Sequence, residues 1–139
     1  MFKKKYFRFG ILQYICSSKM GKHLVISNST ELVRIAPERI VYINAEGNYS
    51  TIMQTDNGTC TVTAQLGDIE KIIDRQLGNE GKVFIRIGRS LIINSSYIYR
   101  INITTPSLVM SDAQTFTHTV KAAKEALKQL KELIEQEAK

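Results

Sequence analysis

Apolar positions along the chain follow different periods, and the longest apolar stretch has no helical period at all. Residues 84–94 read Phe-Ile-Arg-Ile-Gly-Arg-Ser-Leu-Ile-Ile-Asn. This pattern predicts two buried strands that are joined by a turn at Gly88-Arg89-Ser90. Glycine accepts backbone conformations that other residues resist, so we expect Arg89 and Ser90 to stand on a rigid frame. The pattern alone is equally consistent with an arginine on a solvated turn.

Short strand-like segments make up most of the remaining chain. Turn-forming residues separate these segments, and Asn57-Gly58 is a strong hairpin signal because primed turns require positive φ. A turn that begins with Pro37 is expected to be helical, since proline suits a first helical position. We predict strands over residues 23–27, 31–36, 40–45, 49–55, 59–63, 97–104, 107–110 and 115–117.

Two segments change to a helical period. The first covers residues 65–77 and ends at Gly78, which suits a left-handed cap. The second covers residues 119–137, and we expect Thr117 or Thr119 to cap it. The apolar stripes contain Leu66, Ile69, Ile73 and Leu77 in the first helix, and Val120, Ala123, Leu127, Leu130 and Ile134 in the second. The chain is therefore predicted to be mostly β, with one short helix mid-chain and one long C-terminal helix.

Positive charge is concentrated near the start of the chain. The 139 residues include 19 basic and 13 acidic ones, which gives a net charge of +6. Six of the basic residues and no acidic residue lie within residues 1–22. Residues 23–139 therefore have a net charge of zero, which gives little support for nucleic-acid binding by the folded part. A phosphate-binding face has to come from local clustering of basic residues.

The sequence divides into an N-terminal arm, residues 1–21, and one domain of ordinary size, residues 22–139. The arm has a basic start and then an apolar run, which imitates a signal peptide. Arg8 and Gln13 interrupt this run, and a membrane span needs about 20 apolar residues, so no transmembrane segment is expected. We interpret the arm as loosely ordered, with secretion or membrane-surface attachment as alternatives. The true start could also be Met20.

No pattern of reactive side chains predicts an enzyme, a metal site or a cofactor. His23 and His118 lack a second ligand at a metal-binding spacing. The chain has neither a phosphate-cradling glycine loop nor a nucleophile elbow. Cys16 and Cys60 make no disulfide framework and no metal-binding motif. We expect Cys60 to be a buried, unreactive thiol, as in a reducing cytoplasm.

Polar side chains on the loops between strands are the remaining candidates for function. Asn can pair with adenine, Arg with guanine, and Lys or a hydroxyl group with phosphate. Side chains of these kinds are Asn48, Tyr49 and Ser50 after one strand, Arg89 and Ser90 in the turn, and Thr119 and Lys121 at the start of the last helix. Arg86 lies within a strand, where it is expected to make an ion pair or a phosphate contact.

Three segments of the chain resemble the LytTR family of DNA-binding domains. They are the strand that ends in Ala-Glu-Gly-Asn-Tyr at residues 45–49, the short helix at 66–77, and the Phe-x-Arg-x-x-Arg-Ser-x-x-x-Asn segment at 84–94. Their order and spacing match the family over residues 22–135. Gly88 stands where the family usually has histidine, and Lys121 stands where it more often has arginine.

The resemblance implies a fold and a mode of binding. LytTR domains are elongated stacks of small antiparallel β-sheets with a flanking helix, and they insert loops into successive major grooves. DNA contacts carry over to Ser50 with Asn48 and Tyr49, to Arg89 with Ser90, and to Lys121. Lysine lacks the planar fork of arginine, so Lys121 is not expected to read guanine bidentately.

These implications predict a cytoplasmic, sequence-specific regulator of transcription that binds double-stranded DNA at paired repeats. Two copies would bind together, with weak or no dimerisation off DNA. Family members usually carry a receiver domain before this one, and the arm is too short to hold a receiver. The protein then acts alone, is regulated by a separate protein, or is a fragment. The rival readings are a β-rich protein–protein interaction module and a membrane-surface protein that uses the arm.

Overall fold

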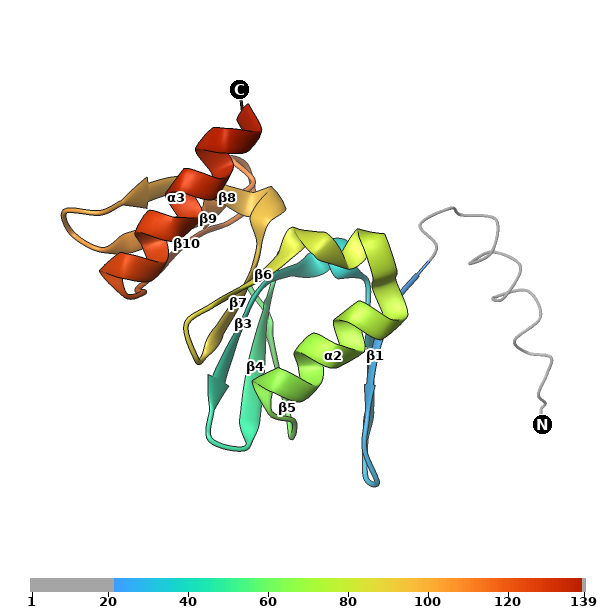
Figure 1. The fold of residues 1–139 in the computed structure, drawn as a ribbon. Coiled ribbons are helices and arrows are strands. Elements are labelled where there is room, and N and C mark those ends of the chain that lie inside the picture. The colour runs from blue at the N-terminus through green and yellow to red at the C-terminus, as the bar shows by residue number, and fades with distance from the viewer. Residues whose placement is uncertain (1–21, 139) are drawn as a thin grey trace.

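The computed structural model describes residues 22–138, which form three antiparallel sheets and two helices (Figure 1). The strands are β1 (Leu24–Ser27), β2 (Leu32–Ile35), β3 (Ile40–Glu46), β4 (Tyr49–Gln54), β5 (Thr59–Val62), β6 (Phe84–Ile87), β7 (Leu91–Asn94), β8 (Ile98–Asn102), β9 (Ser107–Ser111) and β10 (Thr117–Val120). The helices are α2 (Leu66–Leu77) and α3 (Lys124–Ala138), with short 3₁₀ segments η1 (Pro37–Arg39), η2 (Gly78–Val83) and η3 (Ser95–Tyr97). The predicted fold class is confirmed. The expected arm, residues 1–21, lies outside the described residues.

A five-stranded sheet in the order β5-β4-β3-β7-β6 forms the centre of the molecule. All four residues of β7 are buried, and its three apolar residues alternate between two hydrophobic cores. Ile92 belongs to one core, and Leu91 and Ile93 belong to the other. The unbroken apolar run in the sequence therefore reflects a strand that is covered on both faces.

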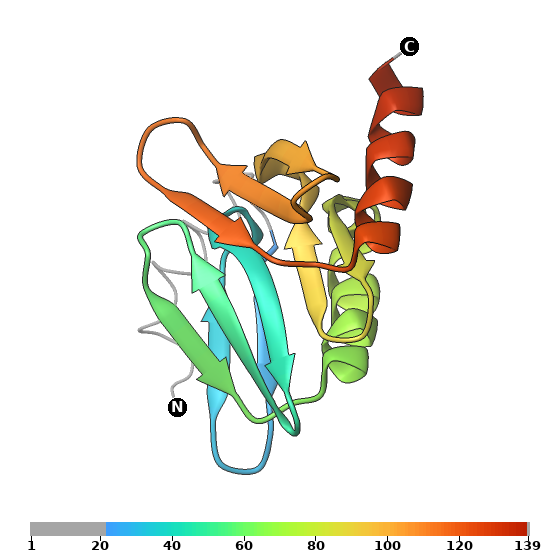
Figure 2. The ribbon, with the colours of Figure 1, turned by 90° about the vertical axis from the view of Figure 1, so that its left-hand side faces the viewer.

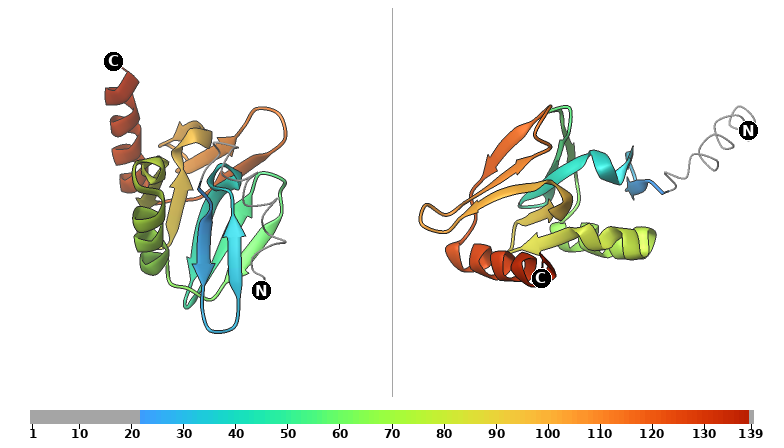
Figure 3. Two further views of the ribbon diagram at one scale, coloured as in Figure 1. Left: turned by 90° about the vertical axis from the view of Figure 1, so that its right-hand side faces the viewer. Right: turned by 90° about the horizontal axis from the view of Figure 1, so that it is seen from above.

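The two cores lie on opposite faces of this sheet. Helix α2 and the β1–β2 hairpin cover one face, while the β10-β9-β8 sheet and α3 cover the other (Figures 1 and 2). Buried residues of the first core include Leu24, Ile43, Ile52, Ile69 and Leu77. Buried residues of the second core include Val41, Leu108, Met110, Phe116 and Leu127. Both helices lie along the same side of the molecule (Figure 3).

Edge strand β6 lies between the two helices and turns alternate side chains to each. Phe84 packs against the core that α2 covers, and Arg86 makes an ion pair with Glu70 of α2. Ile85 and Ile87 belong to the core that α3 covers. This period of two follows from the pleat of a strand, whose successive side chains point to opposite faces. It places one arginine against the surface of α2.

The last helix begins later than its apolar period predicts. Residues 117–120 pair with β9 in the register His118↔Met110 and Val120↔Leu108, and the first helical residue is Lys124. The predictions that a threonine at 117 or 119 caps this helix, and that it starts at residue 119, are therefore wrong. Strand and helix both bring Val120 to an inner face, so its apolar character did not distinguish them.

Candidate nucleic-acid interface

The turn between β6 and β7 depends on the conformation of Gly88. Its φ is +65°, in the left-handed region that L side chains rarely adopt. No heavy atom lies within 4 Å of the position that a Cβ at residue 88 would take. The requirement for glycine is therefore a matter of backbone torsion and not of space. Arg89 and Ser90 follow on the exposed part of the turn.

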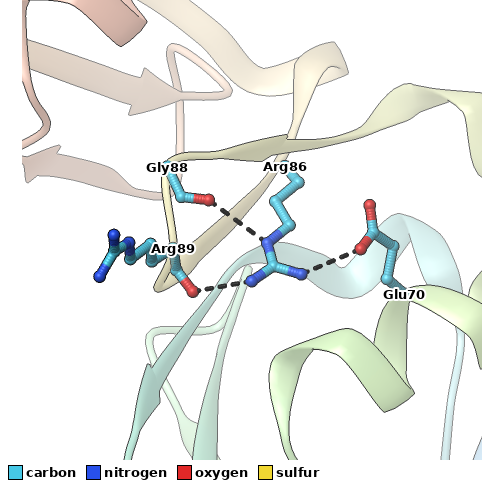
Figure 4. A network of polar contacts seen from close by, with 4 residues as sticks. All are labelled: Glu70, Arg86, Gly88 and Arg89. Atoms are coloured by element: carbon cyan, nitrogen blue, oxygen red, sulfur yellow. Dashed lines mark hydrogen bonds and ion pairs between the residues drawn. The ribbon is translucent and has the colours of Figure 1, made fainter.

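Arg86 lies between this turn and α2 and makes two hydrogen bonds to the turn and one to the helix (Figure 4). Its Nε donates to the carbonyl oxygen of Gly88 at 3.3 Å, and its Nη2 donates to that of Arg89 at 3.0 Å. Its Nη1 donates to Oε1 of Glu70 on α2 at 3.0 Å. The expected ion pair of Arg86 is confirmed. Each of its three guanidinium nitrogens thus donates one hydrogen bond to the protein.

The side chain of Arg89 leaves the turn on the other side. Figure 4 shows its guanidinium directed away from Arg86 and Glu70. Arg89 is exposed, and within residues 22–138 no ion pair involves it. The five N–H donors of its planar fork are therefore free to bind a carboxylate, a phosphate or a guanine edge.

The turn between β3 and β4 lies beside the β6–β7 turn. The backbone N–H of Ala45 donates to the carbonyl oxygen of Ser90 at 2.8 Å, because β3 and β7 are neighbouring antiparallel strands. Asn48 is exposed, and its Oδ1 accepts a hydrogen bond from Nε2 of Gln65 at 3.3 Å. Tyr49 is 55% exposed. The structure thus brings two of the predicted contact segments to one end of the central sheet.

Ser50 does not belong to this exposed surface. It is 1% exposed, and its hydroxyl donates to the carbonyl oxygen of Ala64 at 2.8 Å. The predicted DNA contact of Ser50 is therefore wrong, since its one donor is spent inside the protein. Its hydrogen bond instead fastens β4 to the segment that precedes α2.

The loop between β10 and α3 brings Lys121 to the β6–β7 turn. An open cavity of about 380 Å³ lies between them, lined by Gly88, Arg89 and Ser90 on one side and by Lys121 with Ala122 and Ala123 on the other. Lys121 is exposed in this loop, ahead of the helix and not within it. Thr119 is exposed on β10 and does not line the cavity.

Two side chains at this end were not predicted from the sequence, namely Glu70 and Gln65. Each contacts a residue 16 or 17 positions away, and no local pattern joins such pairs. One signal was available for Glu70. Arg86 alternates with Ile85 and Ile87, so it must point to the face of β6 that carries Phe84 and meets a helix.

The described residues show no arrangement that suits a metal ion or a membrane span. Within residues 22–138 no group of three His, Cys, Asp or Glu side chains is placed to hold a metal. No helix in that range is long and apolar enough to cross a membrane. Cys60 is a free, half-buried thiol, and burial, followed by the charge of Glu31, raises its pKa. A raised pKa lowers its reactivity.

Comparisons with known proteins agree with this structure. The model of the LytTR DNA-binding domain family matches residues 30–135. A solved structure described as the LytTr DNA-binding domain of a response regulator from Bacillus cereus is similar in fold, with a TM-score of 0.54 and 16% identity. The similarity covers 81% of this chain and 96% of that one. No curated protein sequence matches the chain. Because the family model matches most of its length, this chain belongs to the LytTR family of DNA-binding domains.

Proposed function

We propose that this domain binds double-stranded DNA at specific sequences and thereby regulates transcription, with the β3–β4 and β6–β7 turns placed in the major groove. Membership of a DNA-binding family supports the binding of DNA by a regulator. The observation that carries the finer proposal is the state of Arg89. Its side chain is exposed, while the backbone on both sides of it is hydrogen-bonded to Arg86 and Ala45.

In this proposal Arg89 reads a guanine and the neighbouring turn adds a second contact. A guanidinium fork can donate to both O6 and N7 of guanine, which is the commonest specific contact in the major groove. The side-chain amide of Asn48 can pair with adenine in the same way. Ser90 and Tyr49 carry hydroxyl groups that suit a phosphate or a base edge.

Lys121 and Thr119 are proposed to contact the phosphate backbone and not the bases. Lys121 is a point charge on a flexible stem, which suits a phosphate better than bidentate pairing. It lies across the cavity from Arg89 and Ser90, so one DNA strand could run between them. Basic side chains can cluster locally in this way in a domain whose net charge is not positive. A net charge of zero over residues 23–139 is thus compatible with DNA binding.

We further propose that two copies bind together on paired repeats, with weak or no association off DNA. A separate regulatory protein is a proposed partner. The rival function is a protein–protein interaction module that keeps the fold without reading DNA, and the zero net charge of residues 23–139 favours it. The two functions differ in one measurable property, since DNA binding weakens steeply as salt rises through counterion release.

The proposal is tested by changing Arg89 to alanine. Selection from a random pool first gives the preferred duplex. Arg89→Ala should then weaken binding to that duplex by about 1–3 kcal/mol and relax preference at one base pair, with little effect on a scrambled duplex. The measurement is a competition titration against both duplexes.

The matched control is Arg34→Ala, which removes an exposed arginine from β2, in the separate two-stranded sheet. This variant should bind the preferred duplex as the unchanged protein does. Equal weakening on both duplexes by Arg89→Ala would move Arg89 to a backbone contact and leave Asn48 as the base reader. No DNA binding by the unchanged protein would favour the interaction module.

A further inference from the structure

We infer that Glu70 and Arg86 are positioning residues, which fix the β6–β7 turn on α2 so that Arg89 meets its base in one orientation. This inference rests on the proposed function, because it states that two further residues make the reading of a base by Arg89 accurate. Neither residue touches the DNA in this scheme. Arg86 was predicted as a DNA contact, and the geometry points to a role behind the turn instead.

The hydrogen bonds of Arg86 fix the path of the backbone through the turn. Two consecutive carbonyl groups, those of Gly88 and Arg89, accept from the same guanidinium group. A planar, charged fork makes stronger and more directional bonds than a neutral donor does. It therefore fixes two successive peptide planes, and with them the direction in which the side chain of Arg89 leaves the backbone.

The helix that carries Glu70 is a rigid support for Arg86. Glu70 lies on α2, and the neighbouring helix residues Ile69 and Ile73 are 0% and 3% exposed in the core. The guanidinium group also lies over the first turn of this helix, where a Cβ at Gly67 would be 3.8 Å from Nη1 of Arg86. The turn is thus tied to a packed helix through Arg86 and to β3 through Ala45 and Ser90. Rigid support of this kind reduces the ordering cost of binding.

A positioning role of Glu70 and a simple charge effect have different consequences for DNA binding. Glu70 carries a negative charge near a surface that is proposed to meet phosphates. If charge were its only effect, removing it would strengthen binding to every DNA sequence. If it positions Arg86, removing it weakens binding to the preferred sequence alone. The two explanations predict opposite signs, so one variant distinguishes them.

The Glu70→Ala variant should stay folded, so a change in its DNA binding does not reflect unfolding. The side chains of Arg86 and Glu70 are 31% and 45% exposed, so the pair adds little to stability. Glu70→Ala keeps a good helix former in α2. Its matched control is Asp68→Ala, which removes an exposed carboxylate from the first turn of the same helix and leaves Arg86 paired.

The experiment measures two properties of Glu70→Ala, Asp68→Ala and Arg89→Ala. The first is the backbone order of Gly88–Ser90 in the free protein, from NMR relaxation, and the second is the affinity for preferred and scrambled duplexes. Glu70→Ala should lower the order of the turn and weaken preferred binding by about threefold to tenfold, which is the cost of ordering a loosened segment. Its scrambled binding should be unchanged or stronger. Asp68→Ala should show neither loss.

A second variant, Arg86→Lys, keeps the charge and removes the fork, and it should show the same loss of preference as Glu70→Ala. Wild-type turn order in Glu70→Ala would overturn the inference, as would stronger binding to both duplexes. Failure of the proposed function gives a different result. In that case Arg89→Ala would leave binding to the preferred duplex unchanged. The loss of turn order in Glu70→Ala would still show that Glu70 and Arg86 hold the β6–β7 turn.

Discussion

At the scale of single residues, one backbone torsion determines whether the β6–β7 turn can form. Gly88 has a φ of +65° with open space around it. An L residue in the left-handed region costs about 1–2 kcal/mol, and asparagine adopts this region more readily than alanine does. Glycine at position 88 therefore forms this turn without the strain that another residue would bring.

This torsion gives a graded prediction for two substitutions. Gly88→Ala should lower the free energy of unfolding by about 1–2 kcal/mol, while Gly88→Asn should lower it by less. Urea denaturation of the two variants and the unchanged protein gives both values. Equal losses for alanine and asparagine would show that the cost does not arise from positive φ.

At the scale of the elements, helix α3 is held to the sheets by a short apolar stripe. Leu127 is 0% exposed and Leu130 is 4% exposed, both in the core that includes Leu108 and Met110. The prediction that the stripe packs inward is confirmed for these two residues. Ile134 packs against the same core and is half-buried.

Truncation of the stripe should therefore weaken the fold. Leu127→Ala is expected to lower the free energy of unfolding by about 2–5 kcal/mol, since it leaves a cavity in a packed core. The adjacent exposed substitution Lys128→Ala should change it by less than about 0.5 kcal/mol. Chemical denaturation measures both, and the mass in solution should stay unchanged. A loss near zero for Leu127→Ala would mean that this face packs on nothing in the monomer.

The types of the elements could be predicted from the sequence because local periods of apolar residues encode them. Contacts between residues far apart in the sequence could not be predicted in this way. The run at residues 84–94 gave both strands and the turn, and the stripe at 66–77 gave α2. The last strand was predicted at residues 115–117 and lies at 117–120, because its pairing with β9 is a tertiary interaction that overrides a helix-like spacing. Alternation could have shown that Ser50 shares the inner face of Ile52, but its bond to Ala64 needed the fold.

At the scale of the whole molecule, DNA binding depends on the positions of the charges more than on their sum. The described domain has almost no net charge, yet Arg89 and Lys121 face one cavity. Counterion release depends on the number of phosphates that the protein contacts. The salt dependence of binding therefore reports on these contacts one at a time.

A single phosphate contact should be visible in that dependence. Lys121→Ala should weaken binding to preferred and scrambled duplexes alike, and reduce the slope of log affinity against log salt by about one unit. The control is Lys82→Ala, in η2 and away from the cavity, which should leave the slope unchanged. Affinities at several salt concentrations give the slope. A loss on the preferred duplex alone would instead make Lys121 a base reader.

Strand β7 sends Leu91 and Ile93 into one core and Ile92 into the other, and it begins directly after Ser90 of the proposed reading turn. Neither core can come apart without releasing this strand. The domain should therefore lose its structure in a single cooperative event, and the turn should persist until that event. A ligand that binds only the folded state stabilises it by mass action. DNA held by the turn would then protect even the distant end of α3 from unfolding.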